Sequence, residues 1–402
     1  MILWMMPDNA TRTREVMETF INPFKKENPD VSVTIRVINR RTLWRKIFTL
    51  THEIPGDEIP DVIAMPHYWT QLLAVGGVLE NLTELDKTLR VDNSLDPLKP
   101  HSYKNDSADV YSMPWWFDVS ALHYREDHLK LVSKEPRRLL STWQGLLEAC
   151  GMLKEYFENV EGYFPMQNSD WRGMLSNRGV LPCLWSKGAI VISQDGKTAD
   201  FNSPAFESGL QDYIDLALKR YMPILMERNS LGGIGLGKSS MIITRRQGVS
   251  VFERNSGNII LRTLSVPKTG DSYVNYLSGV NLGIIKTGAG KESALKFLKW
   301  ISGVENQIKY ASMAEVFPAA EESFESFMLF SPERMQTYNH IIAESASLPN
   351  LMATGTVMEV LGEVLMSVVN AIVTSRYSED ILKSELKKAA LEVSNILGLY
   401  GG

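Results

Sequence analysis

The N-terminal third of the chain alternates between short apolar runs and amphipathic segments, and this alternation limits the possible folds more than any other feature. Apolar or alternating runs occupy residues 2–6, 31–38 and 62–65. Between them, apolar residues recur at four-residue spacing across 12–28, and a second helix is expected over 43–50. A strand-helix-strand-helix-strand order predicts a parallel sheet with crossover helices. We therefore predict an α/β fold.

Polar and aromatic residues follow each of these predicted strands, although the strands themselves are apolar. They are Asp8 and Asn9 after the first strand, Asn39 after the second, and His67, Tyr68 and Trp69 after the third. Ligands of parallel sheets bind beyond the carboxyl ends of the strands. The pattern thus predicts a ligand site at this edge of the sheet.

The rest of the chain continues to mix strands with helices. Further strands are predicted at 121–124, 241–244, 259–266 and 280–285, and helices at 141–158, 204–220, 291–311 and 378–398. With 402 residues, the chain is long enough for two or three domains at roughly 150 residues each.

Composition excludes several classes of protein. The net charge of −5 argues against a nucleic-acid-binding protein, which usually carries an excess of basic residues. The two cysteines, Cys150 and Cys183, cannot build a disulfide framework, although a single bridge stays open. We expect no membrane-spanning segment, because the most apolar run, 364–373, is well short of the roughly 20 residues that a span needs.

One glycine-rich stretch matches the sequence pattern of a nucleotide-binding loop. Residues 232–239 match the phosphate-binding pattern G-x-x-x-x-G-K-[ST], but a polar stretch precedes them and a strand follows, where that motif needs a strand and then a helix. We interpret the stretch as a flexible loop. The six histidines show no metal-binding spacing, so we expect no metal and no cofactor. No catalytic motif stands out, and a glycoside-acting enzyme is kept only as an alternative class.

Tryptophans point to a different chemistry. The apolar face of a sugar ring stacks on an aromatic ring, while nearby carboxylates or amides bind its hydroxyls. Tyr68 with Trp69, and Trp115 and Trp116 with Asp118, offer that combination. Because neighbouring residues of a strand point to opposite faces, at most one of Trp115 and Trp116 should face a ligand.

Several stretches, taken in order, resemble one family. They are Glu58 to Val62 with Val75 to Leu82, Val110 to Tyr124, Ser141 to Leu146, Gly237 to Met241, Lys291 to Gln307, and Phe317 to Ala319. Together they are similar to the bacterial extracellular solute-binding proteins of family 1, the substrate-capturing components of ABC importers, with the maltose-binding proteins as the nearest type. Arg125 departs from the pattern, since the family usually has Asn there.

The resemblance implies a two-lobe, periplasmic-binding-protein-like fold of type II. Each lobe would be a mixed, mainly parallel sheet flanked by helices, with a hinge between the lobes. The N-terminal lobe would hold residues 1–112 plus 267–318 and the C-terminal lobe 113–266 plus 319–402, with crossovers near 111–118, 262–268 and 317–323.

The resemblance also implies a function and a site. The chain would be a monomeric, non-enzymatic receptor outside the cytoplasm, without its signal segment, that captures a carbohydrate between its lobes and delivers it to an ABC permease. The positions implied to contact sugar are Asp8, Asn9, His67, Tyr68, Trp69 and Asp118, with Trp171, Trp185, Arg245, Ser278 and Gly279 as weaker candidates. Alternative ligands on the same scaffold are a polyol, a glycerol phosphodiester or a polyamine. Arg40, Arg41, Arg245 and Arg246 would favour a phosphate or an acid if they lined the cleft.

Overall fold

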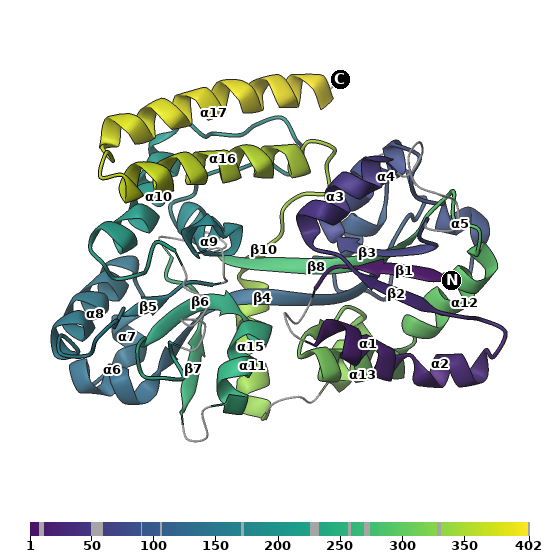
Figure 1. Ribbon diagram of the computed structural model, residues 1–402, viewed down its shortest axis with the longest axis horizontal. Helices are drawn as coiled ribbons and strands as arrows, with labels where there is room; N and C mark the ends of the chain where they lie inside the picture. The colour runs from purple at the N-terminus through teal and green to yellow at the C-terminus, as the bar shows by residue number, and fades with distance from the viewer. Residues whose placement is uncertain are drawn as a thin grey trace. The chain divides into compact units, whose positions relative to one another are not determined.

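The structure is a computed structural model in which the chain forms two compact units (Figure 1). It describes residues 1–7, 12–49, 59–89, 91–104, 107–169, 173–225, 233–255, 259–268, 274–327 and 331–400. Unit 1 comprises Met1–Asp118, Ser278–Leu329 and Leu348–Thr354, and unit 2 comprises Val119–Leu277, Phe330–Ser347 and Gly355–Gly402. The chain therefore passes between the units after Asp118, Leu277, Leu329, Ser347 and Thr354. The crossovers that the resemblance implied, near 111–118, 262–268 and 317–323, stay a prediction.

Unit 1 is built around a sheet in which β1 (Ile2–Met5) lies between β2 (Thr34–Val37) and β3 (Val62–Pro66), with both pairs parallel. The second half of β8 (Asn275–Ile284) adds to β3 in the antiparallel direction. The first half of β4 (Met113–Arg125) pairs with β9 (Phe317–Pro318). The helices of this unit are α1 (Thr13–Phe20), α2 (Asn22–Glu27), α3 (Arg40–Thr49), α4 (Thr70–Val75), α5 (Leu82–Leu85), α12 (Lys291–Ile301), α13 (Val304–Ala314) and α14 (Glu321–Ser326), with 3-10 turns at His67–Trp69 and Lys99–Ser102.

Two of the helices predicted in unit 1 are each divided in two. The helix predicted over 12–28 breaks at Ile21, because Pro23 fits the first turn of a helix and not its interior. The helix predicted over 291–311 breaks at Ser302 and Gly303. Helix α1 packs on both α12 and α13. The ring of Phe20 in α1 lies 5.0 Å from that of Trp300 and 5.1 Å from that of Tyr310, measured between ring centroids.

Unit 2 has a mixed sheet. The second half of β4 runs antiparallel to β6 (Met241–Arg245) and to β7 (Leu261–Leu264), while β5 (Met166–Gln167) runs parallel to β6. Its helices are α6 (Glu126–Val132), α7 (Pro136–Leu139), α8 (Trp143–Tyr156), α9 (Asn177–Ser186), α10 (Pro204–Leu218), α11 (Arg246–Asn255), α15 (Pro332–Ala343), α16 (Thr354–Val373) and α17 (Glu379–Tyr400), with a 3-10 turn at Gly173–Leu175 and a two-residue strand, β10 (Ser345–Ala346), beside β8.

The expectation of a mainly parallel sheet therefore needs a correction in unit 2. The α/β class itself is confirmed, but in the described part of this unit the long strand β4 pairs only with antiparallel neighbours. The reason is the chain path: β4 enters from unit 1, and β6 runs back along it, so that Arg245 at the end of β6 stands opposite Ser120 near the start of this part of β4.

Helix α16 contains the apolar run 364–373, which the sequence analysis judged too short to span a membrane. The apolar run 364–373 is the second half of a 20-residue helix, which by length and composition alone is sufficient to cross a membrane. Within unit 2, Leu361 and Leu365 on one face are buried, whereas Glu359 and Glu363 on the other are exposed. This two-faced pattern is that of a helix packed on a globular unit. Figure 1 shows α17 running alongside α16.

Candidate functional site

The candidate site in unit 1 is the edge at which its three parallel strands end. Because β2, β1 and β3 are adjacent and parallel, the segments that follow Val37, Met5 and Pro66 emerge at the same edge. Asp8 and Asn9, predicted after the first strand, lie outside the described residues. Asn39, predicted after the second strand, is exposed.

Helix α3 and the 3-10 turn after β3 are bound together at this edge. A guanidinium N–H of Arg40 donates a hydrogen bond to the hydroxyl of Tyr68, and its carbon lies 5.7 Å from the centre of the Tyr68 ring. The indoles of Trp44 and Trp69 are 4.7 Å apart. Trp69 is only 2% exposed, so much of its ring surface is already covered. Asn39 accepts a hydrogen bond from the backbone N–H of Thr42 in the first turn of α3.

His67 is packed inside unit 1. Its Nδ1 accepts a hydrogen bond of 2.6 Å from the backbone N–H of Gly279 in β8. Its ring lies 4.0 Å from the ring of His101, and burial lowers the pKa of His67 to about 4. His67 and Gly279 were both predicted to contact ligand. The hydrogen bond between them holds β8 against the end of β3. Ser278, the residue before Gly279, is half-buried.

The pair Trp115 and Trp116 faces opposite sides of β4, as strand geometry requires. Trp115 packs its ring on Tyr310 of α13, 4.1 Å between centroids, and so belongs to the core of unit 1. Trp116 is 5% exposed, and the indole N–H groups of both tryptophans lack a hydrogen-bond partner among the described residues. Because Trp115 packs on Tyr310 in the core, Trp116 is the member of the pair that remains a candidate. Asp118 is fully buried at the end of unit 1.

In unit 2, the corresponding edge lies where β5 and β6 end. These strands are parallel neighbours, with Gln167 opposite Ile242. The predicted residue Arg245 ends β6; it is half-buried, and its guanidinium donates to the side-chain oxygen of Gln247 at 3.0 Å. The carbonyl of Ser169, just past β5, accepts from the hydroxyl of Thr244 at 3.2 Å, which joins the two strand ends.

Trp185 supplies the aromatic surface of this unit. It lies near the end of α9, is half-buried, and meets Tyr276 of β8 edge to face with ring centroids 5.8 Å apart. Trp171 lies outside the described residues. Sequence reasoning missed Tyr276, because only the chain crossing through β8 places it beside α9.

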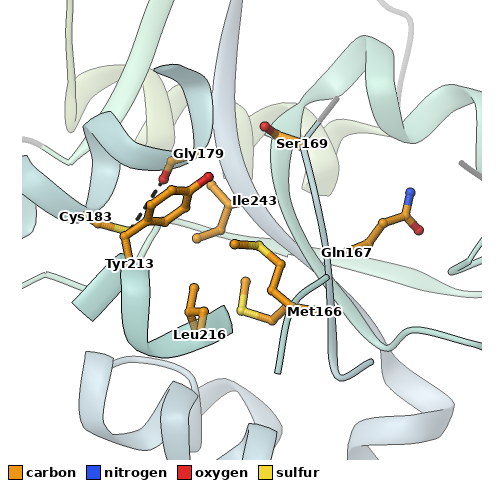
Figure 2. Close-up of a pocket in the computed structure, with 9 residues that line it drawn as sticks. Met166, Gln167, Ser169, Gly179, Cys183, Tyr213, Leu216 and Ile243 are labelled. Atoms are coloured by element: carbon orange, nitrogen blue, oxygen red, sulfur yellow. Dashed lines mark hydrogen bonds between the residues drawn. The ribbon is translucent and has the colours of Figure 1, made fainter. Parts of the chain in front are cut away.

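A small cavity lies close to these strand ends (Figure 2). Its volume is about 10 Å³, the room of one water molecule, so it cannot hold a sugar ring. Figure 2 shows Met166, Leu216 and Ile243 around it, together with Tyr213. Its lining is mainly apolar, and it is a packing defect between α9, α10 and the sheet.

The glycine-rich loop is not a phosphate-binding loop in the part that the structure describes. The backbone N–H groups of Lys238 and Ser239 both donate to the carbonyl of Gly233, at 2.7 and 3.1 Å. The N–H of Ile234 donates to the side chain of Gln167. Donors that a phosphate would need are thus already used, and strand β6 follows the loop, as the sequence analysis expected.

Neither a metal centre nor a reactive thiol is found in the described part of the chain. Those residues contain no group of three or more His, Cys, Asp or Glu that could hold a metal ion. Cys150 and Cys183, whose pairing the sequence left open, are free and buried. Burial raises the pKa of both thiols, which keeps them protonated and unreactive.

Comparison with known proteins identifies the family. A model of the bacterial extracellular solute-binding proteins matches residues 19–340, which is most of the chain. No curated protein sequence matches the chain.

Solved structures share its fold at low sequence identity. An ABC transporter solute-binding protein from Thermotoga lettingae, bound with alpha-D-tagatose, has a TM-score of 0.80 at 19% identity over 99% of both chains. Maltose-bound MalE3 of T. maritima has a TM-score of 0.80 at 21% identity over 98% of this chain and 100% of that one. The GacH receptor of Streptomyces glaucescens, solved without ligand and with acarbose, has a TM-score of 0.81 at 15% identity over 98% of both.

These likenesses confirm the predicted two-lobe α/β fold. The family model, which spans both units, carries the assignment beyond the fold. The chain belongs to the bacterial extracellular solute-binding proteins.

Proposed function

We propose that this chain is the carbohydrate-capturing receptor of an ABC importer. Its family consists of extracellular solute-binding proteins, which favours a binding role over a catalytic one. The similar structures include proteins bound to tagatose, to maltose and to acarbose. In this proposal each lobe contributes contacts to one solute, hinge closure retains it, and a permease receives it. We expect the bound solute to be an oligosaccharide.

The observation that carries the proposal is the pair formed by Trp185 and Tyr276 in unit 2. Their rings meet edge to face at 68°, which is a favourable arrangement of two aromatic rings. Trp185 is only half-buried, so part of its surface stays accessible. A partly exposed indole is a surface on which the C–H face of a sugar ring stacks.

Polar groups at the strand ends complete the proposed binding chemistry. In unit 1, Asn39 is exposed and the hydroxyl of Tyr68 is positioned by Arg40. In unit 2, Arg245 and Gln247 lie at the end of β6. Sugar hydroxyls need donors and acceptors of these kinds around an aromatic face. Trp116, Asp118 and Ser278 remain proposed contacts, as do Asp8, Asn9 and Trp171.

The experiment compares saccharide binding by the native chain with that of Trp185→Ala and Trp185→Phe, measured by titration calorimetry. Loss of the aromatic surface should weaken binding at least tenfold in Trp185→Ala, and Trp185→Phe should retain most of it. Trp143→Phe is the matched control, because Trp143 is 6% exposed at the start of α8 and has no proposed ligand role. Equal affinities of the native chain and Trp185→Ala would overturn the proposal that Trp185 binds the sugar.

A further inference from the structure

Arg245 occupies an electrostatically costly position in unit 2. It is followed directly by Arg246, the first residue of α11, and the first turn of that helix contains no acidic residue. The N-terminus of a helix carries a partial positive charge, so the guanidinium of Arg245 beside it is repelled. Arg245 makes no ion pair with any residue in the described ranges, and its hydrogen bond goes to the neutral side chain of Gln247. Among the described residues, no carboxylate therefore compensates this positive charge.

A buried hydroxyl stands beside Arg245. Ser120 of β4 is the direct antiparallel partner of Arg245, and such cross-strand pairs place their side chains on the same face of the sheet. Ser120 is 0% exposed, and its Oγ has no hydrogen-bond partner among the residues that the structure describes. Buried polar groups are normally hydrogen-bonded, so the hydroxyl of Ser120 is free to bind a polar group of a ligand beside Arg245.

Two more unpartnered polar atoms lie at the end of the neighbouring strand β5. The Oδ1 of Asn168, a residue 1% exposed, and the Oγ of Ser169 both lack a hydrogen-bond partner within the described part of the chain. The hydrogen bond from Thr244 to the Ser169 carbonyl holds this segment against the end of β6. Arg245 at the end of β6 thus has the hydroxyl of Ser120 beside it on β4, and the amide oxygen of Asn168 and the hydroxyl of Ser169 follow the neighbouring strand β5.

We propose that this edge of unit 2 is a subsite for the negatively charged group of an acidic carbohydrate, a sugar carboxylate or a sugar phosphate. The inference rests on the proposed function and adds the chemical class of the solute. The planar guanidinium of Arg245 pairs with two oxygens of such a group, and the hydroxyl of Ser120 donates to it. The Oδ1 of Asn168 accepts from a hydroxyl of the same sugar. A bound anion also offsets the repulsion between Arg245 and the start of α11.

The test uses the full chain and matched saccharides. Glucose, glucuronate and glucose 6-phosphate form one set, galactose and galacturonate a second, and galactotriose with tri-galacturonate a third. Affinities are measured by calorimetry for the native chain, Arg245→Gln and Arg138→Gln. Arg138 is the control because it is on the surface of the same unit, with a side chain that is 85% exposed. Melting curves without ligand check that each variant is folded.

The proposal expects an acidic member of a set to bind more tightly than its neutral counterpart. Arg245→Gln should weaken the binding of that acidic ligand roughly 10–100-fold, the usual range for loss of a charge-assisted pair. Arg138→Gln should leave the affinity for the same ligand unchanged. The carboxylate and phosphate arms show which anion is recognised. Neutral saccharides that bind as well as acidic ones, with equal losses in Arg245→Gln, would overturn the anion subsite but support the proposed function. Binding of no saccharide in any set would count against both.

Discussion

The backbone N–H of Gly279 donates a 2.6 Å hydrogen bond to Nδ1 of His67, and this bond joins β8 to the turn that follows β3. The ring of His67 also meets His101 at 4.0 Å. The same Nδ1 lies 3.0 Å from the carbonyl oxygen of Gly279, which accepts from the ring in its other neutral tautomer. Burial lowers the pKa of both histidines and keeps their rings neutral. Unit 1 is therefore assembled around a neutral histidine pair.

This arrangement predicts that acid destabilises the protein. Burial lowers the pKa of His67 to about 4 and the pKa of His101 well below its usual value. The unfolded chain, with histidine pKa values near 6.5, binds protons that the folded chain excludes. Stability is therefore full above pH 6.5 and falls as the pH drops from about 6.5 towards 4, by about 1.4 kcal/mol per pH unit for each such histidine.

Urea unfolding at pH 7.5, 6.0 and 5.0 measures this dependence. The variant His101→Phe should show a shallower loss of unfolding free energy with falling pH than the native chain. His340→Phe is the control, since the side chain of His340 is 70% exposed. Identical slopes in all three proteins would contradict the account of the histidine pair.

A second prediction concerns Asp61, which precedes β3. Its two carboxylate oxygens accept from the backbone N–H groups of Ile2, at 2.7 Å, and Gly290, at 2.6 Å, so one side chain secures both the start of β1 and the start of α12. Asp61→Ala leaves two amides without an acceptor and should cost about 2–5 kcal/mol of unfolding free energy. Asp96→Ala, at a side chain 91% exposed, should change it by less than about 0.5 kcal/mol. Equal losses of unfolding free energy in Asp61→Ala and Asp96→Ala would show that the hydrogen bonds of Asp61 do not stabilise the fold.

Two helical glycines predict changes of opposite sign. A Cβ at Gly209 in α10 would lie 2.8 Å from the Cα of Leu184 and 3.0 Å from the carbonyl of Cys183, so Gly209→Ala must force α10 away from α9. We expect a loss of about 1–3 kcal/mol. A Cβ at Gly362 in α16 meets no atom within 4 Å, so Gly362→Ala should add roughly 0.5–1 kcal/mol through helix propensity. Thermal unfolding of both variants checks the order, and a Gly209→Ala protein as stable as Gly362→Ala would contradict the packing of α9 on α10.

The loop at 232–239 gives a negative prediction. Because the amides of Lys238 and Ser239 already bond to Gly233, magnesium-ATP should not raise the melting temperature. Lys238→Ala should behave as the native chain does in the same assay. Protection by ATP that disappears in Lys238→Ala would revive the nucleotide-binding interpretation.

The elements of unit 1 were predictable because its strands and helices carry regular apolar spacing. The breaks at Ile21 and at Ser302 were not anticipated, since the apolar faces of α1 with α2 and of α12 with α13 continue across them. The spacing of apolar residues indicates which face of a helix is buried. It does not reveal a turn between two helices whose buried faces continue each other. The antiparallel pairing of β4 with β6 depends on the chain path between units, which local patterns do not encode.

The ligand residues predicted after the strands stay predictions. Two residues of the predicted set, His67 and Trp115, make packing contacts inside unit 1 with Gly279 and Tyr310. Trp185 was implied by resemblance alone, and its partner Tyr276 comes from a strand distant in the chain. Contacts between residues far apart in the sequence decide which aromatic side chains are buried in the core and which stay accessible to a ligand. Those contacts exist only once the sheet is formed.

The central claim, capture of a carbohydrate, is tested most directly by the melting temperature of the native chain against a panel of neutral and acidic mono- and oligosaccharides. A ligand at one hundred times its dissociation constant adds about 2.7 kcal/mol to the folded state, which corresponds to a rise of several degrees. The account predicts such a rise with at least one saccharide, diminished in Trp185→Ala. A panel in which no saccharide shifts the transition, while a polyamine or another non-carbohydrate solute does, would contradict it.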